Sequence, residues 1–207
     1  MNGIENKLNV LIKQFKTINN NNEYKIPNNT VVWFTDGSCI NNGKKNSQGA
    51  FAAICVSGYT KYNMIYGKMS TTNIKPTNIR AEYYGILSAL EKLEYDLKSP
   101  KWDKAIIYSD SKFWIDMIYK YMPKWQVDIF DTKKNPDLTK PLWAIWKKLE
   151  KSNKSVEIIH VYAHNKNNSK DSTDPFKRFC YNNNNIADEL ANIAREFSHT
   201  KITNTFV

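Results

Sequence analysis

The pattern of hydrophobic and polar residues divides this chain into two parts. A short N-terminal part has apolar residues at helical intervals, and a longer part, from Thr30 onward, begins with strand-like apolar runs. In the N-terminal part, four apolar residues recur at helical intervals and an Asn-rich stretch follows them: Leu8, Leu11, Ile12 and Phe15. This pattern predicts an amphipathic helix and a polar linker over residues 1–28. A loosely docked tail is the simplest interpretation, and we assign the segment no role.

From Thr30 onward, three short runs of apolar, β-branched and aromatic residues predict strands. The runs cover residues 31–37, 49–58 and 61–69. We expect a turn at Gly37 to stop the first run. Because the connections are short, the three strands are expected to form an antiparallel meander.

Helices and strands alternate in the second half of the chain. Thr77 can cap a helix over residues 78–98, whose apolar residues recur at steps of three and four. The same reasoning predicts two strands and three helices, at residues 104–110 and 155–164, and at residues 111–122, 142–151 and 185–197. Helices between the later strands imply parallel pairing. The predicted α/β domain spans residues 29–198, with a mixed five-stranded sheet flanked by helices and a tail at 199–207.

The composition of the 207 residues excludes several classes of protein. No apolar run reaches the length of a membrane span, and the first thirty residues lack a signal-peptide pattern. Cys39, Cys55 and Cys180 lie far apart, which indicates neither a disulfide framework nor a zinc knuckle. We therefore expect a protein of a reducing intracellular compartment, cytoplasm or nucleus, without a membrane partner and with a monomer as the default state.

The net charge of +10 favours a polyanionic partner such as nucleic acid, although Lys-rich surfaces also serve solubility. Nearly all the basic residues are lysines, which suit phosphate contacts better than bidentate reading of bases. The charge thus indicates recognition of a nucleic-acid backbone without strong sequence preference.

Four acidic residues occupy positions that core packing does not explain. Asp36 and Asp110 end two apolar strands, and Glu82 and Asp188 come early in two predicted helices. Binding sites in open α/β sheets gather at the carboxyl ends of strands. The four carboxylates are therefore expected to converge, and an all-oxygen cluster binds a hard cation such as Mg²⁺ or Mn²⁺.

Each acid also has a structural alternative. Asp36 before a glycine can shape a turn, and Asp110 can cap the helix that follows it. Glu82 and Asp188 can stabilise helix N-termini through the dipole. The four acids together, in this order among strands and helices, are a stronger signal than any one of them.

The segments FTDGS, TNIRAE, YSDS and the closing ADELA, in this order over roughly residues 30–198, resemble the type I ribonuclease H family. The resemblance implies an endonuclease that hydrolyses the RNA strand of an RNA–DNA hybrid and leaves 5′-phosphate and 3′-hydroxyl ends. It also implies that the four acids hold two Mg²⁺ ions, with Mn²⁺ as a substitute. His164, after the last predicted strand, would assist proton transfer or product release. His160 inside that strand is expected to be structural.

The resemblance also suggests residues that contact the hybrid. The RNA strand would meet residues of the first loop and of the TNIRAE segment: Gly37, Ser38, Cys39, Asn42 and Asn78. The DNA strand would meet Thr77 and, less directly matched, Asn135. Asn and Thr in loops are also ordinary turn residues, so a purely structural role stays open for them.

Three departures from the family pattern stand out. Ile79 replaces a residue that is often Asn or Gln, the interval between His164 and Asp188 is long, and a basic protrusion is shortened. In the shortened region, four residues can still supply phosphate and stacking contacts or simply form a solvated surface: Lys124, Trp125, Lys133 and Lys134.

Two other functions remain open at this point. A DNA nuclease, resolvase or integrase can use the same scaffold, because a fold alone does not fix the reaction. A non-catalytic nucleic-acid-binding module is the second alternative, and it would be expected to lack one or more of the acids.

Overall fold

The computed structural model describes residues 3–57, 63–71, 74–162, 172–197 and 202–205. Their helices and strands follow in the order α1 (Gly3–Asn20), β1 (Thr30–Ile40), β2 (Gln48–Cys55), β3 (Asn63–Lys68), α2 (Asn78–Tyr95), β4 (Lys104–Ser109), α3 (Lys112–Asp116), α4 (Pro136–Glu150), β5 (Ser155–His160), α5 (Pro175–Ala194) and β6 (Ile202–Thr205). A π-helical turn and two 3-10 turns lie between α3 and α4: η1 (Met117–Tyr121), η2 (Met122–Lys124) and η3 (Val127–Thr132).

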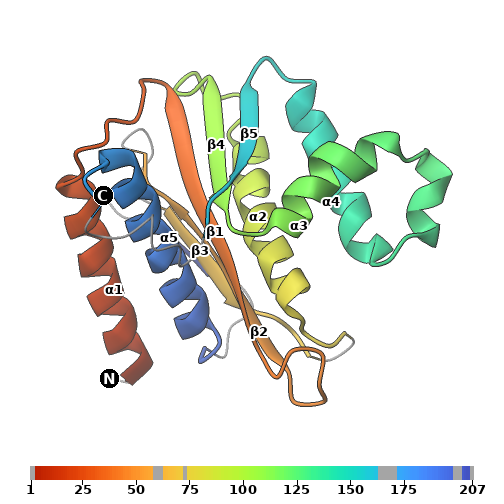
Figure 1. Ribbon diagram of the computed structural model, residues 1–207, viewed down its shortest axis with the longest axis horizontal. Coiled ribbons are helices and arrows are strands. Elements are labelled where there is room, and N and C mark those ends of the chain that lie inside the picture. The colour runs from red at the N-terminus through yellow and green to blue at the C-terminus, as the bar shows by residue number, and fades with distance from the viewer. Residues whose placement is uncertain (1–2, 58–62, 72–73, 163–171, 198–201, 206–207) are drawn as a thin grey trace.

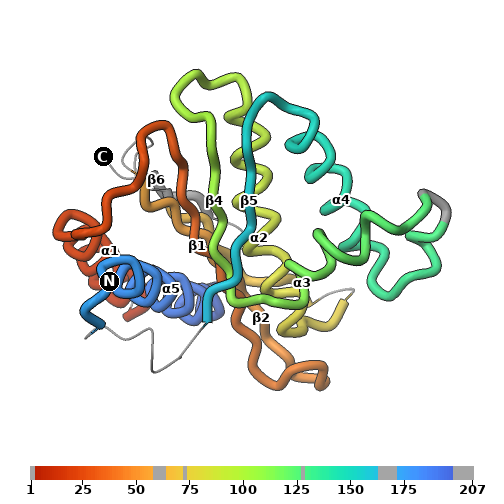
Figure 2. Tube along the Cα trace, turned by 45° about the horizontal axis from the view of Figure 1, so that its top comes forward, coloured from red at the N-terminus to blue at the C-terminus, as the bar shows by residue number. Residues whose placement is uncertain are grey.

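The strands form one mixed sheet in the order β5-β4-β1-β2-β3-β6 (Figure 2). β1, β2 and β3 pair antiparallel, whereas β4 is parallel to both β1 and β5. The predicted five-stranded arrangement is confirmed. A sixth strand extends it, because Ile202–Thr205, expected within a tail, pairs antiparallel with β3.

Helices cover both faces of the sheet (Figure 1), with α1 and α5 on one face and α2, α3 and α4 on the other. Alternate residues of β1 serve the two layers, since side chains alternate along a strand. Val31 and Trp33 pack with α2 and α4, and Val32 and Phe34 pack with α1 and α5. No helix in the described ranges is both long and apolar enough to cross a membrane. All three cysteines are free thiols.

The predicted N-terminal helix forms, but its loose docking was a wrong expectation. Leu11 and Phe15 of α1 are fully buried in the core that α1 shares with α5. At the edge of this contact, Lys7 Nζ lies 2.7 Å from Glu196 Oε1. Burial of an apolar helix face is the main stabilising contribution here, so α1 is part of the folded unit.

Strand β1 continues past the expected turn at Gly37 and ends at Ile40. The reason is that β2 runs back beside it, with Ser38 opposite Ala50 and Ile40 opposite Gln48. These pairs satisfy the backbone hydrogen-bonding groups beyond the glycine. Asp36 therefore lies inside β1 rather than at its end.

Helix α5 begins ten residues earlier than predicted, at Pro175 instead of residue 185. The Asp174 side chain caps it by accepting hydrogen bonds from Phe176 N and Lys177 N. Asn has low helix propensity, but tertiary packing overrides it here because Phe179 packs against Phe34. Asp188 therefore does not lie early in this helix, as predicted, but in its fourth turn.

Helix α4 also begins earlier than predicted, at Pro136 instead of residue 142. Pro136 is favourable in the first turn of a helix, where its missing N–H costs no hydrogen bond. Pro141 lies inside the helix, which its neighbours Leu138 and Leu142 stabilise through their burial.

Candidate active site

Two of the four acids are brought together by the register of the parallel strands β1 and β4. Thr35 lies opposite Ser109, so Asp36 and Asp110 follow these paired residues on neighbouring strands. Asp36 is only 7% exposed. Asp110 does not cap α3, whose N-cap position is held by Ser111.

Glu82 reaches the same region from helix α2, which lies very close to β1. At Gly85, one turn further along α2, an added Cβ atom would be 2.9 Å from the carbonyl oxygen of Asp36. The absence of a side chain at this position lets the helix axis approach the strand. Glu82, the fifth residue of α2, is therefore positioned beside the carboxyl end of β4.

Hydrogen bonds from two side chains orient the Glu82 carboxylate. Ser111 Oγ donates to Glu82 Oε2 at 2.5 Å, and Asn78 Nδ2 donates to Glu82 Oε1 at 2.8 Å. Burial raises the pKa of Glu82, the Ser111 hydrogen bond lowers it, and the charge of Asp110 raises it further. Glu82 is thus held in place by a residue of the β4–α3 junction and by one of the predicted substrate contacts.

Asp188 comes from the opposite face of the sheet, on α5. Four residues further along this helix, Asn192 Oδ1 accepts a hydrogen bond of 2.6 Å from Ser38 Oγ on β1. Ser38 follows Asp36 by two positions, so both lie on the side of β1 that faces α5. The helix and the strand are therefore joined beside these two acids.

The pKa of Asp36 is affected by the three other acids. Burial raises the pKa of Asp36 well above its usual range, and the charges of Asp110, Asp188 and Glu82 raise it further. A hydrogen bond of 2.6 Å from the Gly37 backbone N–H opposes these effects. Like charges that repel one another around a buried carboxylate are stabilised by a cation.

The donor set suits a hard divalent cation, because it consists of carboxylate oxygens from four separate elements. In the described residues, no three His, Cys, Asp or Glu side chains already stand close enough together to hold one ion. The charges of Asp110, Asp188 and Glu82 nevertheless act on Asp36. For three of these carboxylates to hold one ion, their side chains would have to rotate toward one another.

The predicted contacts to RNA lie next to the acids. Asn42 Oδ1 accepts a hydrogen bond from the Asn78 backbone N–H at 3.1 Å, which joins the β1–β2 loop to the start of α2. Gly37 lies against the backbone of α2. Cys39 is half-buried, and burial raises the pKa of its thiol, so it is not an activated nucleophile.

The two predicted contacts to DNA are brought together by a residue that the sequence did not single out, Arg80. Its backbone N–H donates to Thr77 Oγ1 at 3.3 Å, and its guanidinium donates to Asn135 Oδ1 at 3.5 Å. The same guanidinium binds both carboxylate oxygens of Asp137, at 2.6 and 3.1 Å. Thr77 caps α2 as predicted, and Asn135 precedes α4 in a left-handed conformation.

The histidines and Ile79, which the sequence also singled out, either lie outside the described residues or make backbone contacts near the acids. His164 and His199 are not among the described residues. His160 is partly buried, and its Nε2 lies 3.2 Å from the backbone oxygen of Asp110. The Ile79 carbonyl accepts a hydrogen bond of 2.7 Å from Trp114 Nε1.

The shortened protrusion forms the η turns and presents exposed lysines. Lys124, Lys133 and Lys134 are exposed, and Lys133 Nζ lies 5.5 Å from the centre of the Trp125 ring. Trp125 in turn packs against Phe130. The ring is therefore partly engaged within the protein, and the lysines remain accessible to phosphates.

Three residues of the site were missed by sequence reasoning: Ser111, Arg80 and Asn192. Ser111 and Arg80 lie within the motifs YSDS and TNIRAE, so a signal was present there. Asn192 follows Asp188 by one helical turn, which is a usable signal only when the partner strand is known.

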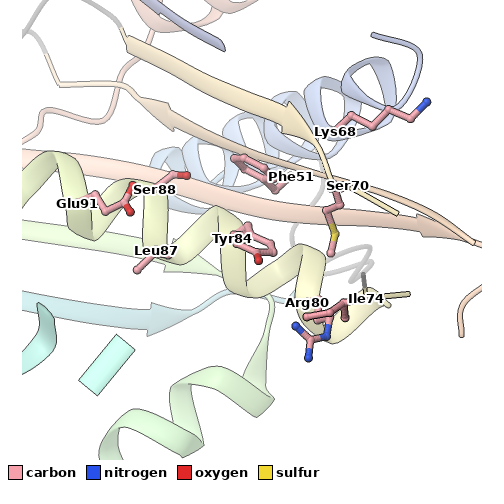
Figure 3. A pocket seen from close by; sticks show the side chains of 10 residues that line it. Phe51, Lys68, Ser70, Ile74, Arg80, Tyr84, Leu87, Ser88 and Glu91 are labelled. Carbon is pink, nitrogen blue, oxygen red and sulfur yellow. The ribbon is translucent and has the colours of Figure 1, made fainter. Parts of the chain in front are cut away.

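A hollow of about 420 Å³ opens on the other flank of α2, beside β2 and β3. Figure 3 shows Phe51 from β2 and Tyr84 from α2 in its wall, with ring centres 5.6 Å apart. Lys68, Arg80 and Glu91 also line it. None of the four acids does, so the hollow is separate from the candidate active site.

Comparison with known proteins identifies the family. The family model for RNase H matches residues 28–196. Ribonuclease H of Clostridium botulinum strain Hall is 31% identical over 168 residues, which are 80% of this chain and 95% of that protein.

Two solved structures share the fold. LC11-RNase H1 in complex with RNA/DNA hybrid has a TM-score of 0.52 at 16% identity, over 80% of this chain and 96% of that one. The PFV RNase H domain has a TM-score of 0.58 at 20% identity, over 80% and 94%. The family model matches most of the length of the chain, and the matched residues include the four acids of the site. The chain belongs to the ribonuclease H family.

Proposed function

We propose that this protein is an endonuclease that hydrolyses the RNA strand of RNA–DNA hybrids and leaves 5′-phosphate and 3′-hydroxyl ends. The observation that carries the proposal is the burial of Asp36 among the charges of Asp110, Asp188 and Glu82 in a chain of this family. Three different elements besides β1 supply those charges, which is costly for a fold unless a cation binds there.

Asp36, Glu82, Asp110 and Asp188 would hold two divalent ions, Mg²⁺ with Mn²⁺ as a substitute. Such ions, when bound, supply a lowered pKa for an attacking water and charge stabilisation at the scissile phosphate. The protein's own part is to fix the carboxylates, and Ser111 and Asn78 do this for Glu82 through their hydrogen bonds. A covalent nucleophile is not needed, in keeping with the raised pKa of the Cys39 thiol.

The hybrid would lie across the edge of the sheet where these acids gather. The RNA strand would meet the backbone at Gly37, Ser38 and Cys39 and the side chains of Asn42 and Asn78, where a 2′-hydroxyl distinguishes RNA from DNA. The Ser38 hydroxyl donates to Asn192 and its backbone pairs with Ala50 on β2, so Ser38 would offer the RNA strand packing contact only.

A phosphate of the DNA strand would bind near Thr77 and Asn135. Both residues are hydrogen-bonded to Arg80, which holds them near one another, while the Arg80 guanidinium is itself paired with Asp137. The exposed lysines of the η turns add charge in the same part of the chain, and they would contribute a salt-dependent share of the affinity.

His164 is proposed to assist proton transfer or product release, as the sequence resemblance implies. Replacing His164 by Ala should slow turnover roughly 10- to 100-fold without abolishing it, which is the usual size of an acid–base contribution. Full activity of that variant in single-turnover and steady-state assays would remove His164 from the proposal.

The proposal also covers the extent of the catalytic unit, the oligomeric state and the cellular compartment. Residues 29–198 would be the catalytic unit, with α1 packed onto it as a stabilising addition. The enzyme would act as a monomer in a reducing compartment inside the cell, because its three cysteines are free thiols and two of them are buried.

Asp110→Asn tests the proposal directly, because it removes a metal ligand and keeps the shape of the side chain. Cleavage should be lost while the circular dichroism spectrum stays close to that of the wild type, and the thermal midpoint in EDTA should not fall, because the variant removes a charge that acts on Asp36. Retained cleavage of the hybrid by this variant would exclude the two-metal assignment.

A further inference from the structure

One hydrogen bond connects the two faces of the sheet beside the acids. Ser38 Oγ donates to Asn192 Oδ1 at 2.6 Å, between residues 154 positions apart in the sequence. Ser38 is only 8% exposed and Asn192 is partly buried, so the bond is partly shielded from competing water.

The positions of the two partners relative to the acids follow from strand and helix geometry. Ser38 and Asp36 are two residues apart on β1 and lie on the same side of the strand. Asn192 and Asp188 are four residues apart on α5 and lie on the same face of the helix. The hydrogen bond and the pair of carboxylates therefore lie in adjacent rows between the same strand and the same helix.

The rest of the contact between α5 and β1 is apolar and less directional. Ile186, Ala187, Leu190 and Ala191 of α5 are fully buried in the core that also contains Val32 and Phe34. Apolar packing allows small shifts along the strand, whereas a buried hydrogen bond fixes two atoms to within a few tenths of an ångström. The repulsion between the Asp36 and Asp188 charges would favour such a shift when no cation is bound.

We propose that Ser38 and Asn192 are positioning residues, whose hydrogen bond fixes α5 on β1 so that Asp188 and Asp36 can ligate the same metal centre. The proposal rests on the function proposed above. It gives Ser38 a role in metal binding instead of a side-chain contact to the substrate, and it gives Asn192 a role that no motif of the sequence indicates.

The test is calorimetric titration of the metal-free, full-length protein with MnCl₂, which needs no substrate and no turnover. Ser38→Ala and Asn192→Ala should each weaken Mn²⁺ binding roughly 10-fold, the lower end of the range for residues that orient metal ligands. The double variant should be no weaker than either single variant, because both changes break the same bond. Ser38→Thr keeps the hydroxyl and should restore the affinity.

Ser57→Ala is the matched control, because Ser57 is also a buried serine, 1% exposed and hydrogen-bonded to Cys55. It follows β2 at the end away from the acids, so its loss should change the thermal midpoint without changing Mn²⁺ affinity. If Asn192→Ala does not fold, Asn192→Ser replaces it, since the shorter side chain cannot reach Ser38.

Hybrid binding in Ca²⁺, measured by fluorescence anisotropy, separates the two roles of Ser38. Unchanged hybrid affinity with weakened Mn²⁺ binding in both single variants is the expected result. Unchanged Mn²⁺ affinity in both variants would overturn the positioning role while leaving the proposed function intact. Absence of Mn²⁺ binding and of hybrid cleavage by the wild type would instead contradict the proposed function itself.

Discussion

A Cβ atom on Gly37 would lie 2.1 Å from the backbone nitrogen of Glu82, a distance that no side chain can occupy. The same atom would be 2.4 Å from the carbonyl carbon of Ala81. Glycine at this position therefore allows α2 to lie directly on β1. This close approach brings the backbone of one acid next to the strand that carries Asp36.

Gly37→Ala should destabilise the fold by about 3 kcal/mol or more, at or above the upper end of the range for overpacking, because the atoms that the new Cβ meets belong to the backbone of α2. Urea denaturation measures the change. Gly85→Ala, whose Cβ would lie 2.9 Å from the backbone carbonyl oxygen of Asp36, should reduce the free energy of unfolding by less. Gly3→Ala is the control, since nothing lies within 4 Å of its Cβ. Equal stability of the Gly37 and Gly3 variants would contradict the close packing.

Stability of the metal-free protein should depend on pH through Asp36. Because burial and the neighbouring acids raise the pKa of Asp36 in the folded state, the folded protein keeps this proton to higher pH than the unfolded chain does. Stability in EDTA should therefore fall as pH rises from about 4 through the raised pKa, and Asp36→Asn should remove this part of the fall.

Thermal midpoints of the wild type and of Asp36→Asn between pH 4 and 8 provide the measurement. In EDTA, the thermal midpoint of the variant should rise relative to that of the wild type as pH increases. Addition of Mg²⁺ should raise the midpoint of the wild type but not that of the variant. Curves that stay parallel over this pH range would show that the Asp36 charge is not under repulsion.

Much of the fold could be predicted because local patterns coincide with the packing. The apolar runs predict the strands β1 to β5, and the spacing of apolar residues predicts α2. The residues of these runs make up much of the two core layers. The end of β1 and the start of α5 could not be predicted. Pairing with β2 extends β1 beyond Gly37, and contacts of Phe179 with Phe34 make an Asn-rich stretch helical. Both outcomes depend on segments that are distant in the sequence.

Ser111→Ala should reduce Mg²⁺ affinity and activity roughly 10- to 100-fold, as removal of a residue that orients a metal ligand typically does. The variant loses the 2.5 Å hydrogen bond that holds Glu82 Oε2. Dependence of the initial rate on Mg²⁺ concentration is the measurement. Ser88→Ala, a buried serine elsewhere on α2, is the control and should keep the wild-type dependence. A Ser111 variant with unchanged Mg²⁺ dependence would show that Glu82 needs no such support.

Arg80→Ala should raise the KM for the hybrid about 10-fold, because Asn135 loses the side chain that holds it at the proposed phosphate contact. Asn135 loses its side-chain partner in this variant, whereas Thr77 keeps the hydrogen bond from the backbone N–H of residue 80. The dependence on Mg²⁺ should stay unchanged, because Arg80 makes no contact with the four acids in the described hydrogen bonds. Steady-state kinetics at several Mg²⁺ concentrations separate the two effects, and an unchanged KM would remove the Thr77–Asn135 region from the DNA contact.

The site itself could be predicted only in part. Asp110 follows the end of β4 and Glu82 lies early in α2, as predicted, whereas Asp36 lies inside β1 and Asp188 lies deep inside α5. Ser111 and Asn192 act through single hydrogen bonds to residues 29 and 154 positions away, and no local pattern encodes such pairs. The hydrogen bond between Asn42 and Asn78 likewise depends on the register of β1 against β2.

The central claim is metal-dependent cleavage of RNA in a hybrid. The most direct measurement is gel analysis of the full-length protein with an end-labelled RNA–DNA hybrid in Mg²⁺. Double-stranded DNA, double-stranded RNA and an EDTA sample serve as controls. Cleavage of the RNA strand in the hybrid alone, lost in EDTA and with 5′-phosphate ends, is the predicted result. Cleavage of double-stranded DNA would indicate a nuclease or integrase on the same fold, and hybrid bound but uncut in both Mg²⁺ and Mn²⁺ would contradict the enzymatic function.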